Sequence, residues 1–267
     1  MARQANNIDE IYMTICKDLV KATKVGNTRE LLNVKLVLTD ITKNIVSVRG
    51  ISPSYLCGEL LWYFNGMNST EFISRFSKFW EKISDNGKTA NSAYGYLMQS
   101  AFGFDQIDTV IKLLKKDPNS RRAVINLNTP HQGVIMTKDE PCTIALQFMI
   151  RKGNLDCTAM MRSNDIWFGT PYDIAFFTEL LKLIAQLLGV GYGYYTHFAT
   201  SLHLYDRDYD NVQCILERAE SHPISIDVKI LNDWKKTILC ALEEHRDMDQ
   251  KALVVDLFKK FGILEEG

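Results

Sequence analysis

Residues 140–143 read Glu140-Pro141-Cys142-Thr143, and this stretch decides how the rest of the chain is interpreted. Its cysteine stands at a proline-led strand start, and three polar groups follow it: Arg162-Ser163-Asn164-Asp165, Gly169-Thr170-Pro171-Tyr172-Asp173 and His203-Leu204-Tyr205. Each group suits a part of a nucleotide. A thiol can attack a ring carbon, arginine and serine can bind a phosphate, an acid can bind a base edge, and histidine and tyrosine can bind a sugar hydroxyl. A lone cysteine is more often a buried small hydrophobe, but together these groups predict one active site.

The composition favours one large domain over residues 1–267. With 267 residues, 46% of them hydrophobic, the chain can bury a sizeable core, and no composition break marks a linker. A formal net charge of -1 gives no electrostatic reason to expect a nucleic-acid polymer or a membrane surface as partner. Any phosphate must therefore be held by locally placed arginines.

The cysteine pattern predicts free thiols and no metal site. Six cysteines are scattered, without a CxxC pair or a histidine at zinc-ligand spacing: Cys16, Cys57, Cys142, Cys157, Cys214 and Cys240. The N-terminus opens into an amphipathic helix, and no segment approaches the roughly 20 apolar residues of a membrane span. We therefore expect a cytoplasmic protein.

Hydrophobic spacing predicts helices and strands that do not alternate regularly. The expected helices are Ile8–Lys24, Tyr55–Asn65, Phe72–Ile83, Ile107–Leu114 and Tyr172–Leu188. The expected strands are Val34–Asp40, Ala123–Leu127, Thr143–Ile150, Leu155–Met161, Tyr194–Leu202 and Ile224–Ile230. This order favours an α+β fold, a large mixed sheet covered by helices, rather than a Rossmann domain. A hairpin of the Thr143 and Leu155 strands would place Cys142 and Arg162 at the same end.

Several candidate residues keep two interpretations. Arg29 is expected in a loop before a strand, as a solvated charge or a phosphate ligand. Glu59 lies among apolar residues and is either a charge that faces outward at the helix edge or a buried acid with a raised pKa. Asp173 falls in a first helical turn, where the helix dipole alone would favour an acid. Arg121 and Arg122 point to opposite faces, so one site can use both only if the chain twists or a partner subunit shares them.

Taken in order, these residues resemble the thymidylate synthase superfamily over most of the chain, up to about Asn211. The matching pieces are Glu59-Leu60-Leu61-Trp62, Gly66, Trp80, Tyr94-Gly95, Ser120-Arg121-Arg122, Pro141-Cys142, Gln147, Arg162-Ser163, Asp165, Gly169, Pro171, and His203 with Tyr205. Many matches in one order make a specific signal, unlike any single motif. The resemblance implies that family's fold and a homodimer formed through the sheet.

The resemblance also implies a role for each matched residue. Cys142 would attack C6 of a pyrimidine, its pKa lowered by nearby arginines, and C5 would then attack 5,10-methylenetetrahydrofolate. Phosphate would be held by Arg29, Arg162 and Ser163, with Arg121 and Arg122 from the second subunit. His203 and Tyr205 would bind the sugar, and Gln147 belongs to the substrate-binding set. Trp80, Asp165 and Gly169 would serve the folate, while Glu59 orders water and Tyr94 completes the catalytic set.

The first departure from the synthases is Asp173, where they carry an asparagine that reads uracil. An amide can donate to O4 and accept from N3–H of uracil, whereas cytosine offers an N4 donor and an N3 acceptor. A carboxyl group that shares one proton matches cytosine and leaves uracil facing an unfavourable acceptor. The base is therefore expected to be cytosine.

The second departure is Thr143, where synthases usually have histidine. With Asn91-Ser92-Ala93-Tyr94 and Met161-Arg162-Ser163-Asn164-Asp165, it resembles the deoxycytidylate hydroxymethylases of phages and their relatives that act on cytidylate. In these, water quenches the exocyclic methylene. The ending Leu264-Glu265-Glu266-Gly267 also lacks the apolar tail that closes over folate in synthases.

The sequence therefore predicts a folate-dependent 5-hydroxymethylase of a cytosine nucleoside monophosphate, with dCMP preferred and CMP as an alternative substrate. A methylase on the same scaffold, acting on dUMP or dCMP, is the nearest rival. A catalytically silent member that binds nucleotide or RNA is the rival from another class, although the near-neutral charge disfavours RNA.

Overall fold

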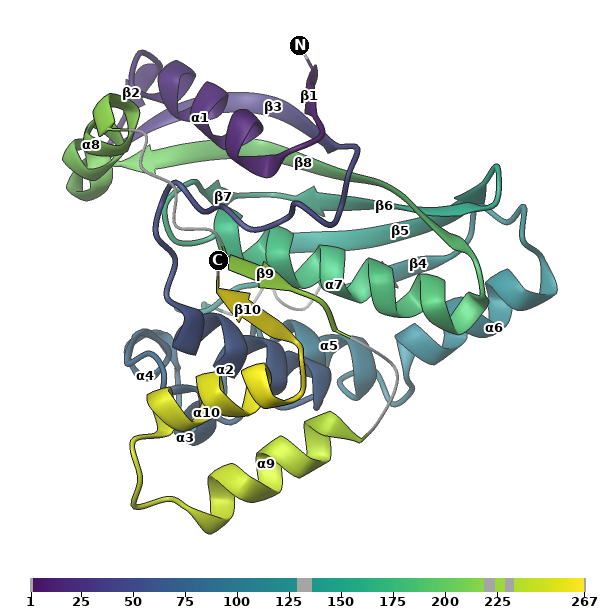
Figure 1. The fold of residues 1–267 in the computed structure, drawn as a ribbon. Coiled ribbons are helices and arrows are strands. Elements are labelled where there is room, and N and C mark those ends of the chain that lie inside the picture. Colours follow the sequence, from purple (N-terminus) through teal and green to yellow (C-terminus); the bar gives the residue numbers. More distant parts are fainter. Residues whose placement is uncertain (1, 129–135, 219–223, 229–232, 267) are drawn as a thin grey trace.

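A mixed β-sheet organises the computed structural model, which describes residues 2–128, 136–218, 224–228 and 233–266 (Figure 1). Within these residues the sheet has eight strands in the order β1-β3-β8-β6-β5-β4, with β2 beside β3 and β7 beside β8. Their bounds are β1 Ala2–Ala5, β2 Thr23–Val25, β3 Thr28–Leu38, β4 Val124–Asn126, β5 Thr143–Arg151, β6 Asn154–Met161, β7 Asn164–Asp165 and β8 Gly191–Tyr205. Parallel pairs such as β6 with β8 stand beside antiparallel ones such as β3 with β8, so the predicted mixed sheet is confirmed.

Helices cover one face of this sheet and form a layer beneath it (Figure 1). The long helix α7 (Thr170–Leu188) packs on β6 and β8, and α1 (Ile8–Leu19) packs on β3. The remaining elements are α2 Pro53–Phe64, α3 Thr70–Ile73, α4 Phe79–Ile83, α5 Tyr94–Gln99, α6 Gln106–Lys116, η1 Asp206–Asp208, α8 Tyr209–Arg218, α9 Trp234–Glu244 and α10 Gln250–Lys260, with the pair β9 Ile224–Ile226 and β10 Leu264–Glu266. The α+β class predicted from sequence is confirmed.

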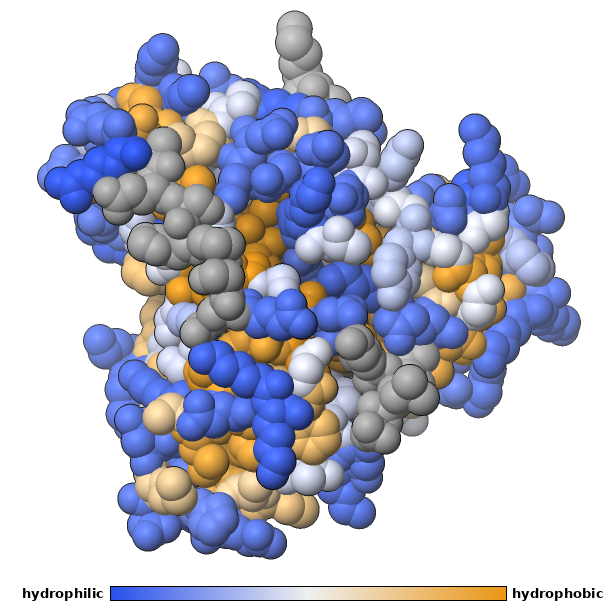
Figure 2. Space-filling view, in the orientation of Figure 1, coloured by the Kyte–Doolittle hydropathy of each residue, from blue (hydrophilic) through white to orange (hydrophobic). Residues whose placement is uncertain are grey.

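Alternation along the strands separates a buried face from an open one. In β6, Leu155, Cys157, Ala159 and Met161 are buried, while the residues between them are partly exposed. Buried side chains from Ile8 to Leu264 form one hydrophobic core. Figure 2 shows hydrophilic residues around most of the rim of this view and hydrophobic ones gathered towards its centre and around α9 and α10. No helix in the described part of the chain is both long and apolar enough to cross a bilayer.

The hairpin of β5 and β6 forms as predicted and places the cysteine. Its two-residue turn has Lys152 at φ 51° and Gly153 at φ 78°, the left-handed pair that suits a tight hairpin. At the far end Thr143 pairs with Met161, and the backbone N–H of Arg162 donates to the carbonyl oxygen of Cys142 at 2.9 Å. Cys142 and Arg162 therefore lie side by side.

Two predicted helices differ from the structure. The Ile8–Lys24 helix ends at Leu19, because residues 23–25 form β2, which pairs with β3 around Gly26 at φ 60°. Arg29, expected in a loop, consequently lies within β3. The Phe72–Ile83 helix is two short ones, α3 and α4. The break falls where Ser74 Oγ donates to the carbonyl oxygen of Glu71, a local serine bond that competes with helix continuation.

The ends of two strands also differ from the prediction. Strand β8 extends to Tyr205, so His203 and Tyr205 lie within it rather than after it, because β3 continues to pair with β8 as far as Thr28. Of the predicted strand Ile224–Ile230, β9 covers the first three residues, and positions 229–230 lie outside the described residues.

Candidate active site

Cys142 sits immediately before β5, in a loop that Arg162 holds in place. The Arg162 guanidinium donates from Nε to the carbonyl oxygen of Pro141 and from Nη2 to that of Glu140, both at 3.0 Å. The thiol is partly buried. Arg162, predicted as a phosphate ligand, thus also fixes the backbone that presents the cysteine, and Ser163 follows it, partly buried, between β6 and β7.

The thiol does not have the lowered pKa expected from the sequence. Burial, reinforced by the negative charge of Asp173, raises the pKa of Cys142 to about 11, and the positive charge of Arg162 offsets only part of this. That expectation is wrong for the single chain, because removal from water outweighs one nearby arginine. To act as a nucleophile, the thiol must transfer its proton as it attacks.

Two acids and a tyrosine form a cluster with the cysteine. Glu59 on α2 is 5% exposed, so the alternative of an outward-facing charge is wrong. Burial raises the pKa of Glu59 to about 8 and that of Asp173 to about 7. Tyr94, at the start of α5, hydrogen-bonds Asp173, which lowers the pKa of that acid, and it interacts electrostatically with Cys142. The four predicted catalytic residues therefore form one cluster.

Glu59 is oriented by a residue that sequence reasoning missed. The hydroxyl of Tyr55 donates to Glu59 Oε1 at 2.6 Å, and the indole Nε1–H of Trp80 donates to the Tyr55 oxygen at 3.1 Å. Tyr55 precedes Glu59 by four residues on α2, so both share one helix face. An aromatic hydroxyl at that spacing before a buried acid is the signal that could have found it.

Asp173 is held by Asn164 of β7 and by the close turn at Gly169. Asn164 donates from Nδ2 to Asp173 Oδ2 at 2.7 Å. A Cβ added at Gly169 would lie 3.0 Å from the carbonyl oxygen of Asp165 and 3.3 Å from Asp173 Oδ2, so glycine lets the turn close over the acid. Asn164 was not predicted as a site residue, whereas Gly169 was predicted as a folate contact and has a packing reason as well.

The predicted sugar and folate residues meet at the end of β8. His203 and Tyr205 have their rings edge to face with centroids 5.1 Å apart. Arg207, which was not predicted, stacks on Tyr205 at 4.2 Å and reaches Asp165 Oδ2 at 3.4 Å. Burial raises the pKa of Asp165 and lowers that of His203. One polar rim therefore joins Asp165, His203 and Tyr205.

Comparison with known proteins identifies the family. The thymidylate synthase family model matches residues 10–249. The chain belongs to the thymidylate synthase family. It is similar to the deoxyuridylate hydroxymethyltransferase of Bacillus phage SP01, with 30% identity over 220 residues that cover 75% of this chain and 57% of the phage protein. It is also similar to the thymidylate synthase of Clostridium beijerinckii, with 26% identity over 220 residues that cover 79% of this chain and 82% of that protein.

The length of the match differs between the two relatives. The chain spans little more than half of the phage protein, but most of the clostridial enzyme. Both matches agree with the family resemblance that the Cys142, Arg162 and His203 motifs indicate. The fold is that of the thymidylate synthase family.

Other predicted ligands of this thymidylate synthase family member lie apart from the cluster. Arg29 stacks over the Tyr209 ring at 4.8 Å and donates from Nη1 to the carbonyl oxygen of Ala22 at 3.4 Å. Arg121 and Arg122 are exposed before β4. Gln147 in β5 donates from Nε2 to the carbonyl oxygen of Arg121 at 2.9 Å, so it supports the arginine segment.

Arg49 is a further polar residue near the site. Its guanidinium lies 4.8 Å from the centre of the Trp167 ring and 5.5 Å from that of Tyr172. Its Nε is buried and has no hydrogen-bond partner within the described part of the chain. No motif flagged Arg49, because its neighbours Trp167 and Tyr172 lie more than a hundred residues further along the chain, before and within α7.

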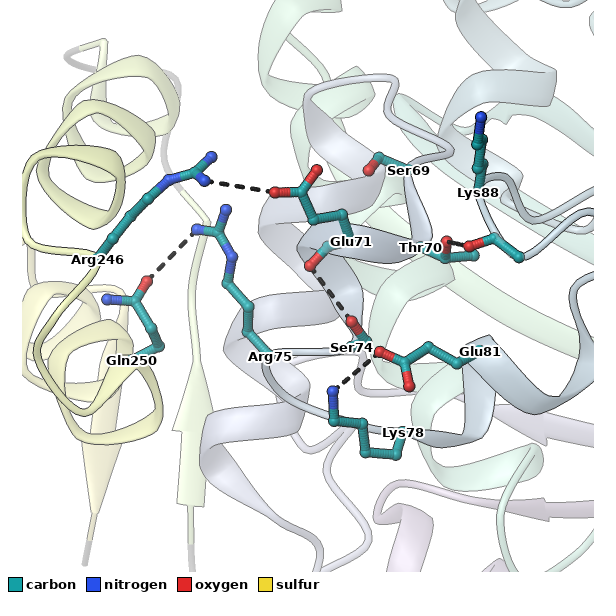
Figure 3. Close-up of a pocket in the computed structure, with 11 residues that line it drawn as sticks. Ser69, Thr70, Glu71, Ser74, Arg75, Lys78, Glu81, Lys88, Arg246 and Gln250 are labelled. Carbon is teal, nitrogen blue, oxygen red and sulfur yellow. Dashed lines mark hydrogen bonds and ion pairs between the residues drawn. The ribbon is translucent and has the colours of Figure 1, made fainter.

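A pocket of about 840 Å³ lies away from this cluster, beside α3 and α4 (Figure 3). It is lined by Ser69, Thr70, Glu71, Ser74, Arg75, Lys78, Glu81, Gly87, Lys88, Arg246 and Gln250. Its charges largely satisfy one another: Arg246 pairs with Glu71 at 3.3 Å and Lys78 with Glu81 at 2.9 Å. It contains none of the predicted catalytic residues, so the cluster around Cys142 is the candidate active site.

The Glu59 environment makes stability depend on pH. Its pKa is about 8 in the folded chain against an ordinary value of 4.5. Between these two pH values the unfolded chain gives up the proton more readily than the folded chain, so the folded state loses stability as pH rises from 4.5 towards about 8. Glu59→Gln keeps the shape without the ionisation. We expect its gain in stability over wild type to grow across this range to a few kcal/mol and then level off.

Thermal unfolding at a series of pH values measures this gain. The exposed Glu81→Gln variant, on α4, serves as control and is expected to show no such growth. A Glu59→Gln difference that stays flat with pH would contradict the raised pKa.

Proposed function

We propose that this chain catalyses folate-dependent 5-hydroxymethylation of a cytosine nucleoside monophosphate, with dCMP preferred and CMP as the alternative. The observation that carries the proposal is Asp173, a carboxyl beside Cys142 and Glu59 whose pKa burial raises to about 7. Near neutral pH this group holds one proton for part of the time. It can then accept from N4–H and donate to N3 of cytosine, a pattern that uracil does not match.

The cluster has the groups that this reaction needs. The sulfur of Cys142 adds to C6, which makes C5 nucleophilic; C5 loses its proton after it has bonded to the one-carbon unit, and elimination of the thiol at the end restores the ring. 5,10-Methylenetetrahydrofolate would supply the one-carbon unit at C5. Glu59, fixed by Tyr55, would hold and activate the water that adds to the exocyclic methylene, since its pKa of about 8 lets it exchange protons near neutral pH. One nucleotide, one methylene-folate and one water would give the hydroxymethyl nucleotide and tetrahydrofolate.

The residues near Asp165 suit a flat aromatic ligand with hydrogen-bond donors. Phe168 is 53% exposed three residues from Asp165, and the indole of Trp80 packs beside Glu59 through Tyr55. An exposed ring offers a stacking surface and a carboxylate accepts from amino and ring N–H groups. Asp165, Trp80 and the turn at Gly169 would therefore hold the folate.

The main rival is methylation on the same scaffold, and the phage relative bears on it. That protein is a deoxyuridylate hydroxymethyltransferase, which supports a hydroxymethyl product; Asp173 is the reason to propose cytosine rather than uracil. Methylation by this chemistry oxidises the folate to dihydrofolate, whereas hydroxymethylation leaves tetrahydrofolate, so the proposed reaction should form no dihydrofolate. A continuous absorbance assay for dihydrofolate alongside product analysis tests the proposal, and dihydrofolate in step with product would favour the methylase.

The open face of the sheet suits a second copy of the chain. Lys35, Phe198, Met160 and Ala145 pair in register across β3, β8, β6 and β5. Phe198 and Met160 are partly exposed, and Ile144 is 42% exposed. Apolar side chains on an uncovered sheet face favour association. We therefore propose a homodimer through the sheet, in which the exposed Arg121 and Arg122 reach the phosphate of the partner's site.

Shared arginines make inactive variants complement each other. A Cys142→Ser chain and an Arg122→Ala chain should each be nearly inactive as homodimers. In a mixed dimer one site carries both changes and the other carries neither. Co-expression with two affinity tags, followed by purification through both, is expected to restore activity to about half that of wild type, since one of two sites is intact.

A preparation in which both tagged chains carry Cys142→Ser is the control and should stay inactive. Mixed dimers no more active than their parents would show that Arg122 acts within its own chain.

We also propose a cytoplasmic location, with no nucleic-acid polymer or membrane as partner. All six cysteines are free thiols, which suits a reducing cytoplasm. The net charge of -1 gives no pull towards nucleic-acid polymers or membrane surfaces.

A further inference from the structure

A chain of buried hydrogen bonds runs from Asp173 away from the cysteine. Asn164 Nδ2 lies 2.7 Å from Asp173 Oδ2, His197 Nε2 lies 3.0 Å from Asn164 Oδ1, and the Tyr195 hydroxyl lies 2.8 Å from His197 Nδ1. Asn164, His197 and Tyr195 are each at most 1% exposed. Strand β7 supplies Asn164 and its neighbour β8 supplies the other two. The relay is therefore part of the sheet rather than of a loop.

Each bond of this relay has a determined direction. An oxygen of Asp173 without a proton can only accept, so Asn164 must turn its Nδ2 towards it and present Oδ1 to the histidine. Burial lowers the pKa of His197 to about 4, so the ring is neutral and carries one N–H. That N–H must be on Nε2, where it donates to Asn164. Nδ1 then accepts from the Tyr195 hydroxyl.

We propose that Asn164 and His197 are positioning residues for base selection, which hold Oδ2 of Asp173 as an acceptor and leave its proton to Oδ1. The inference rests on the proposed cytosine specificity and deepens it. With this polarity Oδ2 is ready to accept from N4–H of cytosine while Oδ1–H donates to N3. Without the relay, the proton of Asp173 could lie on either Oδ1 or Oδ2. With the proton on Oδ2, the carboxyl would present a donor to N4–H and an acceptor to N3 of cytosine, which does not match the base.

The same relay can run in the opposite direction. If residue 173 were an amide whose Nδ2 faced Asn164, the Asn164 amide would turn over to accept from it. Its own Nδ2 would then donate to His197 Nε2, whose proton would move to Nδ1 and be donated to the Tyr195 oxygen. Thr170 Oγ1, now 2.5 Å from Asn164 Oδ1, would accept there and donate to the carbonyl oxygen of Asp165 at 3.1 Å. The turn exchanges Oδ1 and Nδ2 of Asn164, and no other heavy atom has to leave its place.

The tautomer of His197 reports the direction without any substrate. We would label the histidines of the full-length protein with ¹⁵N and record long-range ¹H–¹⁵N spectra at neutral pH, assigning His197 by its absence in His197→Gln. Wild type is expected to show the Nε2–H tautomer and Asp173→Asn the Nδ1–H tautomer. The same tautomer in both, or a charged ring, would overturn the relay.

Substrate preference tests the link to base selection. In Asn164→Leu, which removes the donor at similar size, the ratio of kcat/KM for dCMP over dUMP should fall about 10- to 100-fold, because Oδ2 of Asp173 loses the donor that fixes it as an acceptor. Tyr195→Phe removes one oxygen and is the milder test, which can be used even if Asn164→Leu does not fold. It should lower the ratio several-fold. Tyr192→Phe, on the same strand with its hydroxyl on Gln186, is the matched control and should leave the ratio unchanged.

The outcomes separate this inference from the proposed function. A wild-type protein that acts on neither dCMP nor CMP overturns the function, while the tautomer result still stands or falls by itself. A wild type that prefers dCMP, with folded Asn164→Leu and Tyr195→Phe variants that keep its ratio, overturns the positioning role alone.

Discussion

Replacing Cys142 with serine is expected to reduce turnover by at least ~1,000-fold, because the hydroxyl is a far weaker nucleophile towards C6 and no second thiol among the described residues belongs to the cluster. The change is nearly isosteric, so the fold should be retained. Product formation under single-turnover conditions and thermal unfolding would be measured side by side. Cys240→Ser, an exposed thiol on α9, is the matched control and should retain full activity.

Activity of Cys142→Ser equal to that of wild type would remove the covalent step. If neither protein turned over but both bound nucleotide equally, the chain would belong with the silent, binding members of the family.

Replacing Asp173 with asparagine is expected to reverse the base preference, with the dCMP over dUMP ratio of kcat/KM falling on the order of 10³-fold or more. The amide can donate to O4 and accept from N3–H, which suits uracil and leaves cytosine facing a polar mismatch. Burial makes the mismatch costly, since neither group can turn to water. Initial rates with each nucleotide, for wild type and variant, give the ratio directly.

Asp165→Asn is the control for the Asp173 change, because it neutralises a second acid of the same site. It should lower activity with both nucleotides and leave their ratio unaltered. An unaltered ratio in Asp173→Asn would take away the basis of the base assignment.

Local sequence signals were enough to place the elements that carry the site. Ser52 caps α2 ahead of Pro53, and Gly189 ends α7 in the left-handed conformation, so both helices could be delimited from sequence. The Lys152-Gly153 turn set the register that brings Cys142 beside Arg162. Arg29 was misplaced because the β2–β3 hairpin depends on pairing with β8, which no local pattern contains.

The residues predicted as catalytic lie together in the structure, but the groups that surround and orient them were not predicted. Cys142, Glu59, Asp173 and Tyr94 came from motifs and meet as expected. Asn164 and His197, in contrast, are far apart in sequence and act through a contact between neighbouring strands. The prediction of a lowered pKa for Cys142 was wrong for a related reason. Nearby arginines can be counted in a sequence, whereas the loss of water around the sulfur depends on the packed structure.

Mass spectrometry of the nucleotide product tests the central claim most directly. The purified protein would be incubated with 5,10-methylenetetrahydrofolate and an equal mixture of dCMP, CMP and dUMP, so that the three compete for one site. We predict a gain of one CH₂O unit on a cytosine nucleotide, mainly dCMP, with dUMP unchanged. A gain of CH₂ on any of them, or modification of dUMP in preference to both cytosine nucleotides, would contradict the account.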